Sequence, residues 1–196
     1  MSENKIERVI VGPLHTNCYL VTYGNKTVII DPGAHPNKII AGLTELKLTP
    51  AAIINTHGHW DHVMANNELK AHYNIPMYTP LLDKELLNLE EDHYHIGELL
   101  VDYWYTAELK DLDWPVKIIP TPGHTRGSVC LLLGQDLFSG DTLFAGGCAG
   151  RTDLWSGDPA AMQKSLAELF KLPDDTVVWP GHAESSTIGA ERAFYG

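Results

Sequence analysis

A short histidine-rich segment is the strongest chemical feature of the sequence. It carries three histidines and one aspartate in the order H-x-H-x-D-H, namely His57, His59, Asp61 and His62. In an extended segment, residues i and i+2 point the same way, so His57 and His59 can approach one metal ion together. Asp61 and His62 come where the chain is expected to turn into a helix, so their side chains can diverge toward a second ion. Imidazole and carboxylate ligands together suit zinc, iron or manganese better than calcium or magnesium.

Three further candidate ligands lie in separate segments that share one local setting. Each follows an apolar run and adjoins a glycine, which lets the backbone bend or approach a neighbour closely. Each of them alone would more often be a structural residue. Together with the segment 57–62 they form a candidate ligand set at one end of the predicted strands; the three are His124, Asp141 and His182.

The elements that must hold these residues alternate between short apolar strands and helices. Apolar and β-branched runs predict strands at 6–11, 18–23, 27–30, 51–54, 76–79, 116–120, 128–133, 135–138 and 176–179. Helical spacing of apolar residues predicts helices at 37–46, 63–73, 81–89, 159–170 and 186–194. The acidic and aromatic stretch 90–114 is interpreted as a surface insertion. Two mixed sheets packed face to face, with helices outside, would bury such strands on both faces, so we expect one α/β (α+β) domain over residues 1–196.

Composition and charge restrict the partners. The chain has 196 residues, with 44% hydrophobic and 20% charged residues, as in ordinary soluble globular proteins. Its formal net charge of -11 argues against nucleic acid, which a basic surface would bind. No apolar run approaches the roughly 18 residues of a membrane span, and the N-terminus lacks the pattern of a signal peptide. With only three cysteines, we expect a cytoplasmic protein. We also expect that the protein acts on a small molecule.

Several segments resemble, in order and context over nearly the whole chain, the motifs of the metallo-β-lactamase superfamily, and within it those of the glyoxalase II group, the hydroxyacylglutathione hydrolases. The resemblance implies a four-layer αβ/βα sandwich. It also implies that His57, His59 and His124 hold one metal ion, that Asp61, His62 and His182 hold a second, and that Asp141 bridges the two. The matching segments are Asn17-Cys18-Tyr19, Asp31-Pro32-Gly33, 56–62, 121–128, Ser139-Gly140-Asp141 and Gly181-His182.

A hydrolytic reaction follows from that ligand set. Two divalent metal ions, with zinc expected and iron or manganese as alternatives, would lower the pKa of a bound water to roughly 7. The metal-bound hydroxide would attack the carbonyl of a thioester such as S-lactoylglutathione, because a thiolate leaves with little acid assistance. Asp61 and Asp141 are the candidate catalytic residues, and Asp61 would orient the nucleophile or carry its proton.

Two departures from typical glyoxalase II enzymes leave the substrate open. Those enzymes continue into a helical domain that helps to hold glutathione, whereas this sequence stops at Gly196 and resembles the short single-domain group. The segment 148–153 replaces their Lys and Tyr pattern, and Gly150-Arg151-Thr152-Asp153 also resembles the persulfide dioxygenases, which use one iron. The alternatives are therefore an iron-dependent persulfide dioxygenase, a hydrolase of another ester or lactone, and a non-catalytic metal-binding protein. A secreted β-lactamase is not expected.

A few polar residues outside the ligand set have two interpretations each. Arg151 could bind a substrate carboxylate through both nitrogens, or it could form an ion pair with Asp153 or Asp158. Asp31 could orient a metal ligand, or it could stabilise the turn at Pro32-Gly33. His93 and His95 are interpreted as surface residues, with a place at the mouth of the substrate site as the alternative.

Overall fold

The computed structural model describes residues 4–195, whose strands form two sheets packed face to face. The six-stranded sheet has the order β1-β2-β3-β4-β5-β6, and the five-stranded sheet has the order β11-β10-β9-β8-β7. The first contains β1 (Lys5–Val11), β2 (Thr16–Tyr23), β3 (Lys26–Ile30), β4 (Pro50–Ile54), β5 (Met77–Pro80) and β6 (Tyr103–Tyr105). The second contains β7 (Lys117–Pro120), β8 (Val129–Leu133), β9 (Asp136–Gly140), β10 (Val177–Pro180) and β11 (Ser186–Thr187).

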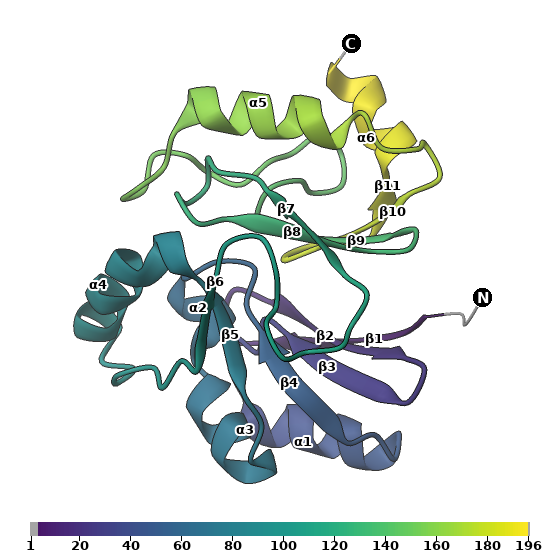
Figure 1. Cartoon of the computed structure of the whole chain (residues 1–196). Helices are drawn as coiled ribbons and strands as arrows, with labels where there is room; N and C mark the ends of the chain where they lie inside the picture. The colour runs from purple at the N-terminus through teal and green to yellow at the C-terminus, as the bar shows by residue number, and fades with distance from the viewer. Residues whose placement is uncertain (1–3, 196) are drawn as a thin grey trace.

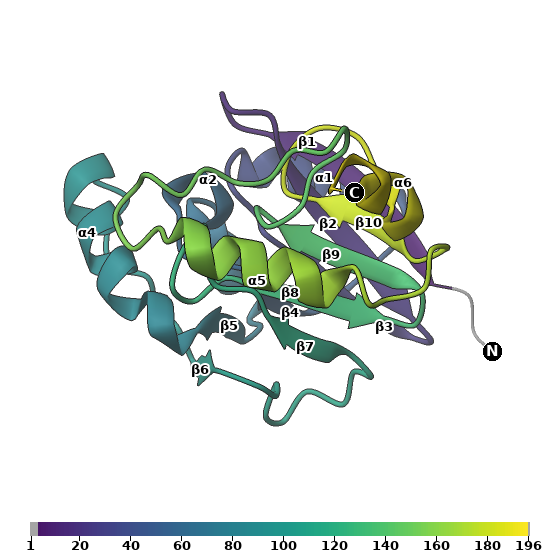
Figure 2. The same cartoon turned by 90° about the horizontal axis from the view of Figure 1, so that it is seen from above.

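Helices cover the outer face of each sheet (Figure 1). In that view α1 and α3 lie beneath the first sheet, whereas α5 and α6 lie above the second. Seen from above, α5 runs across the second sheet (Figure 2). The helices are α1 (Pro36–Glu45), α2 (Trp60–Val63), α3 (Asn66–Tyr73), α4 (Lys84–Tyr94), α5 (Pro159–Leu169) and α6 (Ile188–Tyr195), with a 3-10 turn, η1, at Leu81–Asp83.

Both sheets are mixed. In the first sheet, β1, β2 and β3 pair antiparallel, whereas β3, β4, β5 and β6 pair parallel. In the second sheet, β9 and β10 are parallel and the other pairs are antiparallel. The predicted sandwich of two mixed sheets with outer helices is therefore confirmed.

The apolar strands are explained by burial on both faces. On β2, Tyr19 and Val21 pack in the core between the sheets, whereas Cys18 and Leu20 pack in the core beneath the helices of the first sheet. On β8, Leu131 belongs to the core between the sheets, whereas Cys130 packs with the helices of the second sheet. Because successive side chains of a strand point to opposite faces, a strand covered on both sides is apolar at every position.

The stretch 90–114 is not a surface insertion, so that interpretation was wrong. Its first residues complete α4, and β6 joins the first sheet by parallel pairing with β5. Tyr105 and Trp114 are buried in the core between the sheets. A strand of three consecutive aromatic residues has no alternation of polar and apolar positions, so the sequence pattern did not reveal it.

The helix predicted at 63–73 is also divided. α2 begins at Trp60 and ends at Val63, and α3 begins only at Asn66, so Asp61 and His62 lie within a helical turn. The amide of Ala65 donates to the carbonyl of Pro32 at 3.0 Å, which fixes the break against the loop after β3. Likewise, the first two residues of the helix predicted at 186–194 pair with β10 as β11. None of the helices within residues 4–195 has the length and apolar composition needed to cross a membrane.

Candidate metal centre

The seven candidate ligands, which are far apart in the sequence, come together at one edge of the sandwich. Four of them follow β4 in the first sheet: His57, His59, Asp61 and His62. The other three belong to the second sheet: His124 lies between β7 and β8, Asp141 follows β9, and His182 follows β10. Because β3, β4, β9 and β10 include parallel pairs, their carboxyl ends meet at one edge, which is where α/β sheets place their sites.

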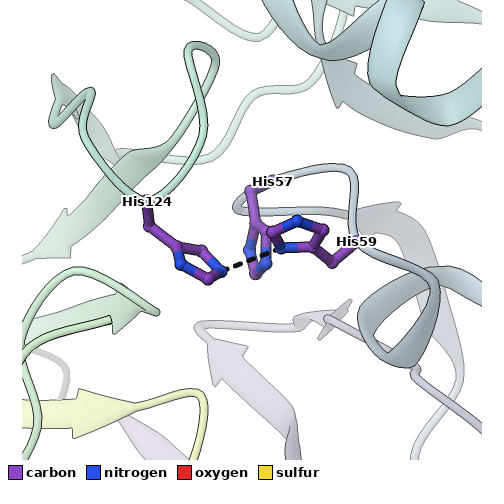
Figure 3. Close-up of side chains that lie close together, drawn as sticks. All are labelled: His57, His59 and His124. Carbon is purple, nitrogen blue, oxygen red and sulfur yellow. Dashed lines mark hydrogen bonds between the residues drawn. The ribbon is translucent and has the colours of Figure 1, made fainter. Parts of the chain in front are cut away.

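The first cluster consists of His57, His59 and His124. One ring nitrogen of each lies within 4.8 Å of the others. The Nδ1 of His59 and the Nε2 of His124 are 2.8 Å apart, and the three imidazoles face a common space (Figure 3). Burial lowers the pKa of His57 well below its usual range and lowers the pKa of His59 to about 3. Both rings are therefore neutral, which is the form that binds a metal ion.

The second cluster consists of Asp61, His62 and His182, again with one ligand atom of each within 4.8 Å. The Nε2 of His182 lies 3.3 Å from Oδ2 of Asp61, and the Nε2 of His62 lies 3.5 Å from the same oxygen. Although burial opposes it, hydrogen bonds to Asp141 and Asp61 raise the pKa of His182 to about 9. The same carboxylates raise the pKa of His62 against the effect of burial. This cluster therefore retains protons that a metal ion would replace.

Asp141 lies between the two clusters. Its Oδ2 is 3.4 Å from Nε2 of His124 and 3.5 Å from Nε2 of His182, and its Oδ1 is 3.3 Å from Nε2 of His62. The carboxylate thus faces ligands of both clusters. Gly181 permits this approach, because a Cβ at that position would lie 2.2 Å from Oδ1 of Asp141.

Two buried polar atoms indicate that a cation belongs in this space. The Nε2 of His57 and the Oδ1 of Asp141 have no hydrogen-bond partner among the described residues. A buried polar atom without a partner costs roughly 1–3 kcal/mol, and such atoms are rare in folded proteins. A metal ion coordinated by these atoms would remove that cost. The residues present therefore fit a metal centre.

Neighbouring groups orient the imidazoles. Asp31 accepts from the amide and the hydroxyl of Thr56, both at 2.7 Å, and its Oδ2 is 3.0 Å from Nδ1 of His62. Because Thr56 gives its single hydroxyl proton to Asp31, the Nδ1 of His57, 3.1 Å away, must donate to Thr56. The Nε2 of His57 then carries the lone pair, and the Nε2 of His62 does so once a metal ion replaces its proton. The contacts of Asp31 match the orienting role among its two predicted interpretations.

The second-sheet ligands are held by backbone carbonyls. The Nδ1 of His124 donates to the carbonyl of Arg151 at 2.7 Å, and the Nδ1 of His182 donates to the carbonyl of Leu14 at 3.1 Å. The hydroxyl of Thr16 donates to Oδ2 of Asp61 at 2.9 Å. Each contact fixes the direction of a candidate ligand before any metal ion binds.

Asp83, at the end of η1, is a site residue that sequence reasoning missed. Its fully buried carboxylate accepts from the amide of Gly58 at 2.9 Å, the hydroxyl of Thr125 at 2.7 Å and the amide of Gly127 at 2.6 Å. Asp83 therefore joins the loop of His57 and His59 to the loop of His124. The only available signal was an aspartate that follows two leucines, which by itself is uninformative.

A cavity of about 690 Å³ opens above the centre, and His59, Asp61, His124, Asp141 and His182 lie at its base. Arg151 lines it, but its guanidinium binds both carboxylate oxygens of Asp153 at 2.8 Å. Asp158, the other candidate partner of Arg151, instead accepts from the first amides of α5. His93 also lines the cavity, as its alternative interpretation anticipated, whereas His95 is not among the lining residues.

Comparison with known proteins agrees with this geometry. A family model described as the metallo-beta-lactamase superfamily matches residues 11–182. The chain belongs to that superfamily. It is therefore a metallo-hydrolase by family, with a His/Asp cluster able to bind metal ions.

Relatives that match nearly the full length of the chain include the following two proteins. An uncharacterized protein of Aquifex aeolicus (strain VF5) is 38% identical, over 96% of this chain and 94% of that protein. The hydroxyacylglutathione hydrolase GloC of Haemophilus influenzae is 34% identical, over 95% of this chain and 94% of that protein. The predicted resemblance to the hydroxyacylglutathione hydrolases of this superfamily is thereby confirmed.

Two solved structures are also similar. The BLEG-1 B3 metallo-beta-lactamase has a TM-score of 0.88 and 32% identity, over 96% of this chain and 97% of that chain. TTHA1623 in a di-iron-bound form has a TM-score of 0.85 and 36% identity, over 95% of this chain and 96% of that chain. These matches confirm the fold and leave the metal and the substrate to be decided by the site.

Proposed function

We propose that this superfamily member is a hydrolase of thioesters with two divalent metal ions, and S-lactoylglutathione serves as the reference thioester for the assay. One observation carries the proposal. The cluster of Asp61, His62 and His182 is complete beside Asp141, in addition to the cluster of three histidines. Hydrolysis by two cations requires a second set of ligands. A reaction that uses a single redox-active ion would leave this second set without a metal.

The proposed metal assignment follows the two clusters. His57, His59 and His124 would hold one ion, Asp61, His62 and His182 the other, and Asp141 would contact both. Zinc is the expected metal, with iron and manganese as alternatives, since these donors suit all three. When bound, the two ions would acidify a water molecule to a pKa of roughly 7 and polarise the substrate carbonyl.

The side chains of the chain itself have separate tasks in this scheme. Asp61 is held by Thr16, and its carboxylate at the base of the cavity would orient the attacking water and accept its proton. His62 holds the pKa of Asp141 well below its usual range although burial opposes it, so this carboxylate stays ionised. The thiolate of a thioester leaves without a strong acid, so no further proton donor is needed.

Relatives support this choice in part. GloC carries the name hydroxyacylglutathione hydrolase, and the di-iron form of TTHA1623 supports two ions in a closely similar fold. We further propose a small-molecule substrate and a cytoplasmic location. A substrate carboxylate could bind Arg151, as predicted, only in exchange for Asp153.

The test is to remove metal, reload the protein with zinc and assay S-lactoylglutathione. We expect two zinc ions per chain by elemental analysis, and thioester cleavage without oxygen consumption. A firm plateau at one ion per chain, with His182 uncoordinated, would contradict the two-metal centre.

The alternative function is an iron-dependent persulfide dioxygenase. It is favoured by the motif Gly150-Arg151-Thr152-Asp153 and by the iron found in TTHA1623. The iron form should be supplied with glutathione persulfide in an oxygen electrode. Rapid oxygen uptake, together with no thioesterase activity in the zinc form, would replace our proposal by this alternative. Hydrolysis of a β-lactam should be assayed in the same experiment, because the structure is similar to that of the BLEG-1 metallo-beta-lactamase.

A further inference from the structure

We propose that the cavity selects thioesters whose acyl group is apolar and whose thiol portion carries no net charge. This inference rests on the proposed thioester hydrolysis and specifies its substrate class. It rests on the side chains that form the walls of the cavity, which are largely apolar, whereas the candidate ligands at its base are polar.

Apolar side chains line the cavity on two sides. From α2 and α4, Trp60 and Tyr94 stack on each other with ring centroids 4.8 Å apart. From the segments after β9, Phe144, Leu154 and Trp155 line it as well. Trp155 remains 46% exposed and Leu154 38% exposed. Substrate groups that covered these surfaces would remove apolar area from water on both partners, which favours binding.

The walls offer little to an anionic substrate. Among the described residues that line the cavity, Arg151 is the only lysine or arginine, and Asp153 already binds its guanidinium through both oxygens. Glu90, which lines the cavity from α4, adds a carboxylate that accepts from the amide of Trp60 at 3.0 Å. The formal net charge of -11 adds a repulsive field, which two bound divalent ions would offset only in part. A substrate with two carboxylates, such as a glutathione thioester, therefore finds no free cation on the protein side chains.

A homologous series of substrates measures the first part of the proposal. Acetyl, butyryl and hexanoyl thioesters of N-acetylcysteamine differ only in acyl length and carry no charge. Burying one methylene group favours binding by about fourfold, so we expect kcat/KM to rise two- to fourfold per methylene, mainly through KM. We also expect the hexanoyl thioester to exceed S-lactoylglutathione in kcat/KM by about tenfold or more.

Matched variants locate the effect in the cavity. Trp155→Ala and Leu154→Ala should lower the ratio of hexanoyl to acetyl kcat/KM by about three- to tenfold. Leu100→Ala removes the same side chain as Leu154→Ala from a position that is 57% exposed and does not line this cavity, so its ratio should equal that of the unaltered protein. Zinc content should be unchanged in all three variants.

The outcomes separate this inference from the proposed function. A kcat/KM that is flat across the acyl series, or higher for S-lactoylglutathione than for the hexanoyl thioester, would overturn the apolar selectivity while leaving the thioesterase intact. An equal loss of chain-length dependence in Leu100→Ala would also overturn it. If the zinc-loaded protein hydrolyses none of the thioesters, the proposed function itself fails, and this inference fails with it.

Discussion

At the scale of single residues, four histidines of the centre fall into two protonation classes. Burial keeps His57 and His59 neutral, whereas nearby carboxylates raise the pKa of His62 and His182 above the usual histidine value. The difference follows from position, because Asp61 and Asp141 lie within 3.5 Å of both rings of the second class. Metal binding at the second cluster must therefore displace protons from His62 and His182, whereas the neutral rings of His57 and His59 have no such proton to lose.

We predict that metal uptake at the second cluster releases protons near neutral pH. The pKa of His182 is about 9, so this ring is protonated at pH 7 and must lose its proton to bind a metal ion. The affinity of the second ion should therefore rise with pH up to about 9, and the first ion should depend less on pH. Calorimetric titration in buffers of different ionisation enthalpy measures the protons released. If binding of the second ion released no proton, the assignment of this ion to the cluster that contains His182 would be contradicted.

Asp141 is the residue whose loss should affect both clusters. Asp141→Ala removes the carboxylate that faces His62, His124 and His182, so we expect both metal occupancy and activity to be lost. His93→Ala and His95→Ala, at exposed positions outside the two clusters, should leave metal content unchanged. Elemental analysis of the three variants checks this. Loss of metal in either histidine variant would place the centre elsewhere.

At the scale of elements, the loops that carry the first cluster depend on a residue outside it. Gly58 and Gly127 both lie close to Asp83, and a Cβ added at Gly127 would be 2.6 Å from its carboxylate. This close approach lets one buried carboxylate accept from two different loops. Asp83 therefore joins the loops after β4 and before β8 into one hydrogen-bonded unit.

We predict that Asp83→Asn loosens this unit. The side-chain NH2 group of the new asparagine would face an N–H or O–H donor where a carboxylate oxygen of Asp83 now accepts. This leaves a buried donor unpaired, at a cost of about 1–3 kcal/mol. Loss of an orienting contact should weaken metal binding at the first cluster by about 10- to 100-fold. Asp113→Asn, at a fully exposed position, is the matched control. Urea unfolding of the metal-free proteins and calorimetric metal titration measure both effects, and two variants of equal affinity would refute the orienting role.

At the scale of the whole molecule, the centre joins the two sheets. The first sheet supplies His57, His59, Asp61 and His62, and the second supplies the other three candidate ligands. Few backbone contacts make the same connection at this edge, among them Val129 N to Thr56 O at 3.0 Å and Asn17 N to Gly181 O at 2.7 Å. Bound cations would therefore hold the two halves of the sandwich together.

Metal removal should accordingly lower the thermal stability of the whole chain. A ligand present at 100 times its dissociation constant stabilises the folded state by about 2.7 kcal/mol. For a chain of this size, each kcal/mol corresponds to about 2–4 °C in Tm, so a chelator should lower Tm by roughly 5–10 °C. Calorimetry with and without chelator measures the shift. Asp141→Ala is the control, and a chelator-induced shift as large in this variant would show that the stabilising ion lies elsewhere.

Features that depend on local spacing follow from the amino-acid sequence alone. The run of consecutive apolar residues on β2, such as Tyr19 and Leu20, predicted a strand buried on both faces, because neighbouring side chains of a strand point in opposite directions. The H-x-H-x-D-H segment and the residues after the later strands predicted ligand types, because imidazole and carboxylate chemistry is a property of the side chain alone.

Which of these groups meet depends instead on how the chain folds in three dimensions. β6 forms because β5 leaves a free edge, and Asp83 becomes an acceptor because two glycine-containing loops approach it from distant parts of the chain. Arg151 is paired with Asp153 although Asp158 was an equal candidate, since Asp158 accepts from the first amides of α5. Such contacts join residues whose separation in the sequence carries no periodic signal. They depend on how the two sheets pack, which no local pattern encodes.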